Sequence, residues 1–382
     1  MTTPQFKQLR QSYGFDEVAI VPGDVTINPD QTKIDLKIGK VNLGIPFIAS
    51  AMDGVADVNM AIAMNKLGGM AVLNLEGVQT RYEKPEEVLA EIANASQEEV
   101  TPLMQRVYSQ PIKENLIGER IRAIKAAGAV AAVSVTPANT KKFAPLCVEA
   151  GLDILVVQST VTSARHISKS QKGLIFSELC KNTPVPVLVG NCVSYSATLE
   201  LMKTGVAGVL IGVGPGAACT SRTVLGVGVP QITATIDCAA AREEYRRESG
   251  KYIPIITDGG FRNGGDVCKA IVAGADGVMI GSLFAMANEA PGRGFHWGMA
   301  NPHASLPRGT RIKVGTKAPL EQILFGPSSL TDGSLNLVGA LRTCMGICGS
   351  RTIAAMQKAE IVIAPSITTE GKSWQMSQRG GR

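Results

Sequence analysis

The sequence predicts an α/β protein folded as a single (β/α)8 barrel (TIM barrel), with a long flap after the eighth strand. Eight short apolar runs of strand length recur along the chain, and helical stretches alternate with them. Glycine-rich polar segments follow several of these runs, at the strand ends where such barrels carry their active sites. With 382 residues, the chain is long enough for one domain of this kind, 1–382.

The first two barrel strands are expected at 46–49 and 69–74, with a helix over 58–67 between them. The other six strands are expected at 131–135, 154–157, 185–189, 208–211, 253–257 and 277–280. Helical spacing of apolar residues is clearest at 117–127, 194–203 and 264–273. Each apolar run is short enough to be one buried strand, and the alternation predicts parallel strands joined by helices.

Two segments interrupt this repeat. Between the second and third strands, 80–116 carries charged, helix-like sequence at 83–92 and 100–114. After the eighth strand, 286–336 is rich in Gly, Pro and Asn, which predicts a mobile flap over the site. Beyond Thr352 the sequence indicates no more than one further helix.

Composition limits the classes of partner and compartment. The net charge of +6 is spread along the chain, which suits a small anionic substrate, and no basic block interleaved with aromatic residues predicts nucleic-acid binding. Arg242, Arg246 and Arg247 alternate with glutamates, as on a solvated helix face. The eight cysteines have no CxxC spacing, and no apolar signal or membrane segment is present. We therefore expect a cytoplasmic protein that binds no membrane.

The stretch 212–222, GVGPGAACTSR, is the most informative part of the sequence. Glycines at every second position and a proline exclude regular helix, so the strand before it must end in a tight loop with exposed backbone. Cys219 closes this loop. Such a loop presents a thiol at the mouth of a site, whereas a cysteine taken at random is more often a buried structural residue.

Two further strand ends carry glycine-rich motifs. In 257–266, TDGGFRNGGD, a carboxylate at a strand end precedes a helix start, so it can accept ribose hydroxyls while free N–H groups face a phosphate. In 279–282, MIGS, a strand again turns into a helix. Either motif alone is common in barrels, but the three motifs in this order and spacing form a specific pattern.

These motifs, together with 13–18, YGFDEV, resemble the IMP dehydrogenase and GMP reductase family. In that family the loop cysteine attacks C2 of a purine nucleotide, a hydride leaves to a nicotinamide cofactor, and a covalent thioimidate results. The resemblance implies a purine nucleoside monophosphate as substrate and NAD as cofactor. Segment 80–116 is too short for the pair of regulatory modules that many IMP dehydrogenases insert there, so no inserted domain is expected.

The resemblance also implies a role for each matching position. The implied catalytic residues are Cys219, Ser221, Glu289 and Arg308. The implied nucleotide-binding residues are Ser50, Met52, Ala217, Asp258, Gly260, Gly281, Ser282, His296, Gly298, Met299, Ala300 and Thr316. The cofactor is expected near Gln158, Ser159, Asn191, Gly212 and Gly214, and a monovalent cation such as K+ at the carbonyls of Gly214, Gly216 and Cys219. Core packing remains the alternative for Met52 and Met299, and a solvated loop carboxylate the alternative for Glu289.

Several positions depart from the family pattern. Gln158 stands where the family has an aspartate that contacts the dinucleotide, and Ala217 where it has a phosphate-binding serine. Leu210 replaces a basic residue, and His296 replaces a tyrosine beside the base. His296 is expected to contact the ligand, and the alternative is a polar side chain whose hydrogen bonds the protein itself satisfies. Ser221 replaces threonine, which keeps the hydroxyl and loses a methyl group.

The direction of the reaction follows from smaller differences. The flap lacks the Arg-Tyr pair that activates water in IMP dehydrogenases, leaving Arg308 or Arg311 for that role. This absence and the missing regulatory insertion at 80–116 are both typical of reductases. Val229, where reductases carry tyrosine, and 289–292 resemble the dehydrogenases. Because pocket residues bear directly on chemistry, we favour oxidation of IMP to XMP with NAD. A GMP reductase and a catalytically silent purine-nucleotide-binding protein are the alternatives, and the resemblance implies a homotetramer or homo-octamer.

Overall fold

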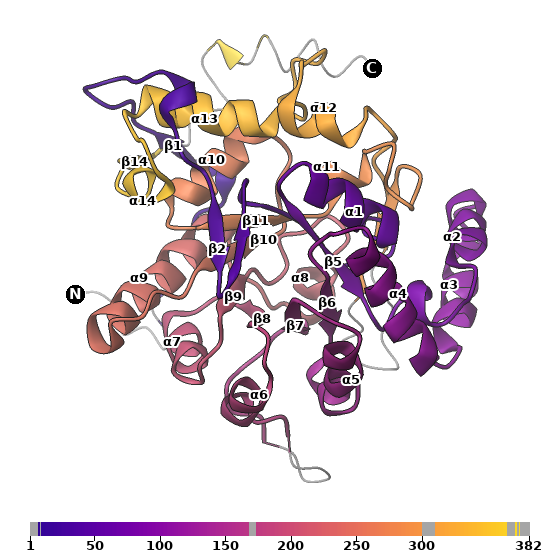
Figure 1. Cartoon of the computed structure of the whole chain (residues 1–382). Helices are drawn as coiled ribbons and strands as arrows, with labels where there is room; N and C mark the ends of the chain where they lie inside the picture. Colours follow the sequence, from indigo (N-terminus) through magenta and orange to yellow (C-terminus); the bar gives the residue numbers. More distant parts are fainter. Residues whose placement is uncertain are drawn as a thin grey trace.

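The computed structural model describes residues 7, 9–167, 173–299, 310–364, 371, 372 and 374. Within these residues, eight parallel strands close into a barrel in the order β10-β11-β4-β5-β6-β7-β8-β9 (Figure 1). The strands are β4 (Phe47–Ala49), β5 (Met70–Asn74), β6 (Ala132–Val135), β7 (Ile154–Gln158), β8 (Val187–Cys192), β9 (Gly208–Ile211), β10 (Ile255–Asp258) and β11 (Gly277–Ile280). The predicted fold class is confirmed, and all eight strands lie where the sequence predicts them, to within three residues.

The barrel interior is closed at its amino-terminal end by a hairpin. The hairpin strands β2 (Leu36–Ile38) and β3 (Val41–Leu43) pair with each other outside the barrel. Their side chains Leu36, Ile38 and Leu43 are buried in one cluster with residues of the barrel strands, among them Ile48 and Met279. Because apolar side chains seal this end, the opposite end, where the strands finish, is left for a site.

A ring of helices covers the outside of the barrel (Figure 1). Its members are α1 (Val58–Lys66), α4 (Glu114–Ala126), α5 (Pro137–Glu149), α6 (Phe176–Asn182), α7 (Tyr195–Lys203), α9 (Gln231–Ser249) and α10 (Gly264–Val272). The side chains of Asp57, Ser194 and Asn263 cap α1, α7 and α10 by accepting from backbone N–H groups of the first turn. The four helices predicted at 58–67, 117–127, 194–203 and 264–273 are confirmed.

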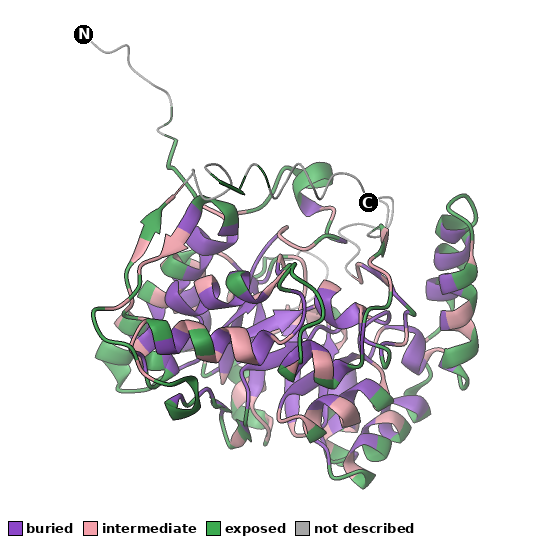
Figure 2. Ribbon diagram, turned by 90° about the horizontal axis from the view of Figure 1, so that it is seen from above, coloured by how far each residue is buried: buried purple, intermediate pink, exposed green. Residues whose placement is uncertain are grey.

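Segment 80–116 forms a helical hairpin that projects from the side of the barrel (Figure 2). It consists of α2 (Pro85–Asn94) and α3 (Val100–Ser109) and follows the short helix η3 (Val78–Thr80). The predicted helix at 100–114 is too long, because α3 ends at Ser109 and α4 begins at Glu114. Pro111 explains this break, since the residue before a proline is driven out of the helical region, and Gln110 has extended angles.

Part of the predicted flap has regular structure. After β11 come α11 (Ser282–Ala285), β12 (Phe295–Trp297), β13 (Arg311–Lys313) and α12 (Leu320–Phe325), and β12 pairs antiparallel with β13. Trp297 and Leu320 are fully buried, so these portions belong to the packed body. Residues 300–309, between β12 and β13, lie outside the described residues.

Both ends of the described chain pack on the same side of the molecule. The amino-terminal part holds η1 (Phe15–Glu17), β1 (Val18–Ile20) and η2 (Pro29–Gln31), and the carboxyl-terminal part α13 (Leu337–Ile347), α14 (Ile353–Met356) and β14 (Ile361–Ile363). β1 and β14 form a two-stranded antiparallel sheet, and α13 packs against α10. The prediction of no more than one helix after Thr352 misses β14, whose three residues have a partner only at the other end of the sequence.

Two findings bear on compartment and membrane contact. All eight cysteines lie in the described part of the chain and are free thiols. No helix among the described residues is long and apolar enough to cross a membrane.

The interpretation of Arg242 as part of a solvated helix face is wrong. Its side chain is 4% exposed and donates to Asp276 Oδ2 and to the Gly274 carbonyl, both at 2.8 Å. Arg242 lies on the inner stripe of α9 with Cys238 and Tyr245, and the neighbouring glutamates hide this spacing in the sequence. Arg246 and Arg247 are exposed, as predicted.

We expect Arg242→Met to lower the free energy of unfolding by about 3 kcal/mol or more, because removal of one partner leaves the Asp276 carboxylate buried without its cation. Arg246→Met is the matched control on the same helix, and its expected effect is below about 0.5 kcal/mol, since that side chain is 58% exposed. Thermal and urea unfolding of both variants measure the difference. Equal losses in the two variants would show that the buried pair adds nothing to stability.

Candidate active site

A cavity of about 420 Å³ opens at the carboxyl end of the barrel, and residues at or just after the ends of all eight strands contribute to its wall. Most of the predicted site residues meet there. These are Ser50, Met52, Gln158, Ser159, Asn191, Gly212, Gly214, Gly216, Ala217, Cys219, Ser221, Asp258, Gly260, Gly281, Ser282, His296, Gly298 and Met299. The structure therefore brings the predicted nucleophile, nucleotide and cofactor positions into one cavity.

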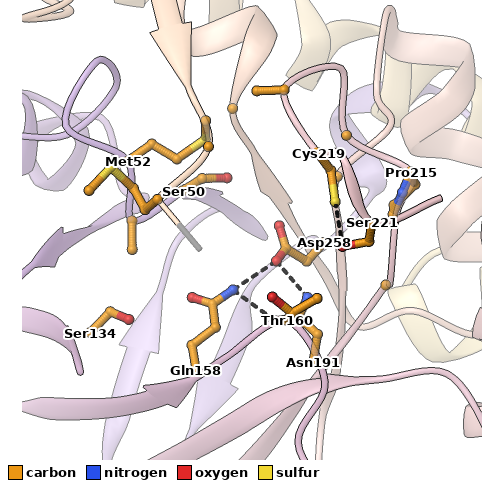
Figure 3. A pocket seen from close by; sticks show the side chains of 18 of the residues that line it. Ser50, Met52, Ser134, Gln158, Thr160, Asn191, Pro215, Cys219, Ser221 and Asp258 are labelled. Carbon is orange, nitrogen blue, oxygen red and sulfur yellow. Dashed lines mark hydrogen bonds between the residues drawn. The ribbon is translucent and has the colours of Figure 1, made fainter. Parts of the chain in front are cut away.

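Cys219 lies in the loop after β9, and its thiol is exposed in the cavity (Figure 3). Its Sγ donates a hydrogen bond to Ser221 Oγ at 3.3 Å, and Ser221 begins the short helix α8 (Ser221–Leu225). The loop starts in a crowded position, because a Cβ on Gly212 would lie 2.3 Å from the Asp258 carbonyl oxygen. Gly214 has a φ of +84°, which favours glycine. Both glycines thus let the loop fold against β10 and direct Cys219 into the cavity.

Asp258, the last residue of β10, is the centre of a polar cluster beneath the Cys219 loop (Figure 3). Its Oδ2 accepts hydrogen bonds from Gln158 Nε2 at 3.0 Å and from Asn191 Nδ2 at 2.8 Å. Gln158 Nε2 also donates to Asn191 Oδ1 at 2.8 Å. Burial raises the pKa of Asp258 to about 6, although the two amide hydrogen bonds act to lower it. Asp258 is therefore charged at neutral pH and loses its charge in weak acid.

The orientation of Gln158 follows from this cluster. A carboxylate only accepts hydrogen bonds, so the carboxamide of Gln158 must turn its NH2 group toward Asp258. Its Oε1 then faces the Ser134 side of the cavity, as Figure 3 shows. Gln158 thus links the two sides of the cavity through one planar group.

His296 and Ser282 line the cavity next to each other. His296 Nε2 and Ser282 Oγ lie 3.0 Å apart, and the imidazole is 2% exposed. Burial lowers the pKa of His296 to about 4, so the ring is neutral at pH 7. Its Nδ1 has no hydrogen-bond partner among the described residues. His296 lines the cavity, and its contact with a ligand stays a prediction.

One side of the cavity is missing from the sequence-based prediction. Asn74, Glu76, Ser134 and Thr136 line it, and all of them stand at or just after the ends of β5 and β6. Glu76 accepts hydrogen bonds from Thr136 N at 2.6 Å and from Asn139 Nδ2 at 2.9 Å. A search for polar residues at every barrel strand end would find this side.

The polar groups on this side suit a nicotinamide cofactor. Hydroxyl and amide groups of Ser134, Thr136, Asn74, Gln158 and Ser159 offer both donors and acceptors, as ribose hydroxyls and a carboxamide require. They lie in the same cavity as Cys219, so a dinucleotide held here would reach the same space as a bound purine.

Two predicted site residues do not line the cavity. The carboxylate of Glu289 accepts a hydrogen bond from Leu320 N at 2.8 Å and so caps the first turn of α12. Thr316 is exposed beyond β13. Because neither side chain lines the cavity, the predicted roles of Glu289 and Thr316 receive no support from the structure. Ala300 and Arg308 lie outside the described residues.

Arg311 does not line the cavity either. Its Nη1 donates to the carbonyls of Ile92 and Ala93, at 2.5 and 3.4 Å, at the carboxyl end of α2. Of the two arginines considered for activating water, Arg311 is therefore committed to the helical hairpin. Leu210, which replaces a basic residue, is fully buried inside the barrel.

The predicted K+ site depends on backbone carbonyls. Among the described residues, no group of three or more His, Cys, Asp or Glu side chains could hold a metal ion. The Gly216 carbonyl accepts a hydrogen bond from Cys219 N at 3.0 Å, which leaves it a second lone pair. Carbonyl oxygens suit hard cations, and the role of Gly214, Gly216 and Cys219 stays a prediction.

Known proteins share both the sequence and the fold. Residues 12–373 match the IMP dehydrogenase / GMP reductase domain. An uncharacterized oxidoreductase of Mycolicibacterium smegmatis is 37% identical over 363 residues, 93% of this chain and 97% of that protein. Inosine-5'-monophosphate dehydrogenase of Cryptosporidium parvum is 31% identical over 406 residues, 96% of this chain and 94% of the other.

A solved structure agrees with these matches. The crystal structure of an IMP dehydrogenase/GMP reductase-like protein from Corynebacterium glutamicum superposes with a TM-score of 0.89 and 33% identity, over 95% of this chain and 97% of that one. The similarity covers the barrel and its loops together, and the motif residues occupy one cavity. This chain belongs to the IMP dehydrogenase / GMP reductase family of oxidoreductases.

Proposed function

We propose that this protein is an IMP dehydrogenase, which oxidises IMP to XMP with NAD through a covalent intermediate on Cys219. The observation that carries the proposal is the exposed Cys219 thiol in the same cavity as the Asp258 carboxylate. A reactive cysteine needs access to its substrate, and a buried structural thiol has none. The seven other cysteines of the chain are buried or half-buried and do not line this cavity.

The cavity offers a distinct group for each part of the nucleotide. Asp258 at the end of β10 accepts hydrogen bonds from the ribose hydroxyls. Backbone N–H groups near Gly260 and Gly281, with the Ser282 hydroxyl, hold the phosphate. The purine then lies between Cys219 and the wall that contains Met299. In this orientation C2 of the base faces the sulfur.

The chemistry requires a bond between sulfur and carbon. The Cys219 thiolate attacks C2, and the tetrahedral carbon then loses its hydrogen with the bonding electron pair. Gln158, Ser159 and Ser134 would hold the NAD cofactor, which would supply the acceptor for this hydride. Water next attacks C2 of the thioimidate, the C–S bond breaks, and XMP leaves with the thiol restored. Ser221 Oγ, 3.3 Å from Sγ, is placed to exchange a proton with the sulfur.

The short segment 80–116 does not favour the reductase direction. The relative from Cryptosporidium parvum is named as an IMP dehydrogenase, and this chain matches 94% of its length. A dehydrogenase of this family therefore does not require a chain much longer than this one. With Arg311 bound to the hairpin, Arg308 is the remaining arginine proposed to activate water.

A spectrophotometric assay of the purified protein tests the proposal. We expect NADH to appear at 340 nm with IMP and NAD, and XMP to form in equal amount. Turnover with GMP and NADPH alone would instead identify a GMP reductase, and nucleotide binding with no turnover would identify a silent binding protein. The same assay in potassium chloride and in sodium chloride, at equal ionic strength, tests the predicted cation site. We expect higher activity in potassium chloride.

A further inference from the structure

The hairpin of α2 and α3 packs on the strand that leads into the cavity wall. The two helices form a separate apolar cluster with Trp297 of β12. Tyr108, near the end of α3, is 7% exposed, and Trp297 is fully buried. The members of this hairpin cluster are Val78, Leu89, Ile92, Val100, Leu103, Met104, Val107, Tyr108 and Trp297. The hairpin therefore contributes a core of its own beside the barrel.

The hydroxyl group of Tyr108 connects α3 to the loop after β4 and to the segment that contains Trp297 and Met299. It accepts a hydrogen bond from Trp297 Nε1 at 2.6 Å and donates one to Asp53 Oδ2 at 2.7 Å. Its Oη also lies 3.6 Å from Met299 Sδ. Asp53, in the loop after β4, is itself fixed, because Val78 N donates to the same carboxylate at 2.7 Å.

The Asp53 carboxylate, which accepts the hydrogen bond of Tyr108, is tightly packed on the barrel side. A Cβ on Gly77 would lie 2.0 Å from Asp53 Oδ1, so the carboxylate fills the space beside that glycine. Moving the Tyr108 hydroxyl would leave a buried indole N–H and a buried carboxylate without this partner, which is costly. Tyr108 of α3 therefore restrains the position of the Trp297 side chain.

The residues around Trp297 form part of the cavity. His296 precedes it, and Gly298 and Met299 follow it, and all three line the cavity. A second contact supports the same wall, because Arg311, which pairs with Trp297 across β12 and β13, donates to the carboxyl end of α2. The guanidinium of Arg311 also lies 4.5 Å from the centroid of the Phe295 ring. Both strands of this ribbon are thus held by the hairpin.

We propose that the α2–α3 hairpin supports the purine-binding wall of the active site, and that Tyr108 is the positioning residue through which it acts. The inference rests on the proposed function, since it assigns the base of the nucleotide to the wall at 296–299. Binding groups must be held within about 0.5 Å of their productive geometry by the residues behind them. Here the supporting residue Tyr108 is 189 positions from Trp297 in the sequence.

Tyr108→Phe tests this role, because it removes the hydroxyl and keeps the packed ring. We expect the KM for IMP to rise about tenfold and kcat to change less than about twofold, since ground-state placement of the base is affected. Tyr82→Phe is the matched control. Tyr82 also packs against the hairpin cluster, but its hydroxyl donates to the Val107 carbonyl, at 3.2 Å, instead of bonding to Trp297. We expect this variant to keep the wild-type KM.

Tryptophan emission gives a readout that does not depend on turnover. The chain has two tryptophans, Trp297 and the exposed Trp374, so Trp374→Phe leaves Trp297 as the only emitter. In that background, Tyr108→Phe should shift the emission of the free protein and Tyr82→Phe should not. IMP added to the protein with Tyr108 intact should change the emission, because the wall next to Trp297 receives the base.

A double-mutant cycle separates positioning from general destabilisation. If Tyr108 acts through Trp297, Tyr108→Phe and Trp297→Phe together should raise the KM no more than the larger single effect. Wild-type turnover of IMP with an unchanged KM and emission in Tyr108→Phe would overturn this inference alone. A KM raised equally by Tyr82→Phe, or additive effects in the cycle, would also overturn it. Failure of the wild-type protein to bind IMP counts against the proposed function, and the inference falls with it.

Discussion

Cys219→Ala is expected to abolish oxidation of IMP, with kcat lower by more than about 10⁴-fold, because the seven other cysteines lie outside the cavity and cannot replace its bond to C2. Binding should persist, since Asp258 and the phosphate-binding loops remain. We expect the Kd for IMP, measured by calorimetry, to stay within about threefold of the wild-type value. Loss of kcat with retained binding is the result that a nucleophile predicts and that a structural cysteine does not.

Mass spectrometry of the protein quenched during turnover shows the intermediate directly. The wild-type protein should carry one nucleotide, and peptide mapping should locate it on Cys219. Cys180→Ala is the matched control, because burial raises the pKa of that half-buried thiol to about 11 and it lies outside the cavity. This control should keep full activity and the adduct. An adduct on another cysteine, or turnover by Cys219→Ala, would contradict the proposed mechanism.

Ser221→Ala should give a smaller and different defect. The variant loses the hydroxyl that lies 3.3 Å from Sγ and keeps the nucleophile. A proton-transfer group contributes about 10²- to 10⁴-fold, so we expect kcat to fall by about 100-fold while the adduct remains detectable. This difference between the two neighbouring residues separates attack on C2 from proton transfer.

The barrel could be predicted from the sequence because its strands are buried on both faces. The strands β9 and β11 are fully buried, inside by the barrel core and outside by helices, so each is a short continuous apolar run. The polar residues at the strand ends then had to meet, since a closed parallel barrel brings all its carboxyl ends together. This geometric rule explains why most predicted site residues share one cavity.

The contacts of the hairpin could not be predicted in this way. Tyr108 and Trp297 are separated by 189 positions, and no local pattern marks two residues as partners at that distance. Arg242 shows the same limit, since its partner Asp276 lies 34 positions away and neighbouring glutamates suggest an exposed face. The catalytic role predicted for Glu289 depends on its place in a motif, and only the structure shows that its carboxylate caps α12.

Asp258→Asn is the second substitution with a large expected effect. The side chain accepts from Gln158 and Asn191 and, in the proposed complex, from the ribose hydroxyls. The amide removes the charge and turns one acceptor into a donor. We expect the KM for IMP to rise about 10- to 100-fold, because a hydrogen bond to a charged group contributes about 1.5–3 kcal/mol. Steady-state kinetics and calorimetry measure this loss.

The pH dependence of binding identifies the carboxylate. Since the pKa of Asp258 is raised to about 6, the wild-type protein should lose affinity for IMP as the pH falls below 6. The second pKa of the nucleotide phosphate is also about 6, so the pH profile of binding by the wild type must be compared with that of Asp258→Asn. The phosphate contribution cancels in the difference between the two profiles. Parallel profiles for wild type and variant would exclude Asp258 as the titrating group.

The same substitution should stabilise the free protein. The pKa of Asp258 in the folded state lies above its ordinary value of 3.8, so the carboxylate lowers stability as the pH rises from about 4 to 6, and the loss persists at higher pH. Without ligand, we expect the Tm of Asp258→Asn at pH 7.5 to exceed the wild-type Tm by roughly 2–3 °C. This difference should shrink toward pH 4, where the wild-type carboxylate is protonated.

Asp332→Asn is the control of opposite sign. Partial burial acts to raise the pKa of Asp332, but hydrogen bonds from Lys317 and Ser334 hold it at about 2, so its charge stabilises the fold above that pH. We expect this variant to have a lower Tm and an unchanged KM. Replacement of an aspartate that only stabilises the fold lowers the Tm and leaves the KM unchanged, whereas replacement of Asp258 should raise the KM and also raise the Tm. An Asp258→Asn variant that is less stable than wild type at pH 7.5 would place Asp258 in the first group.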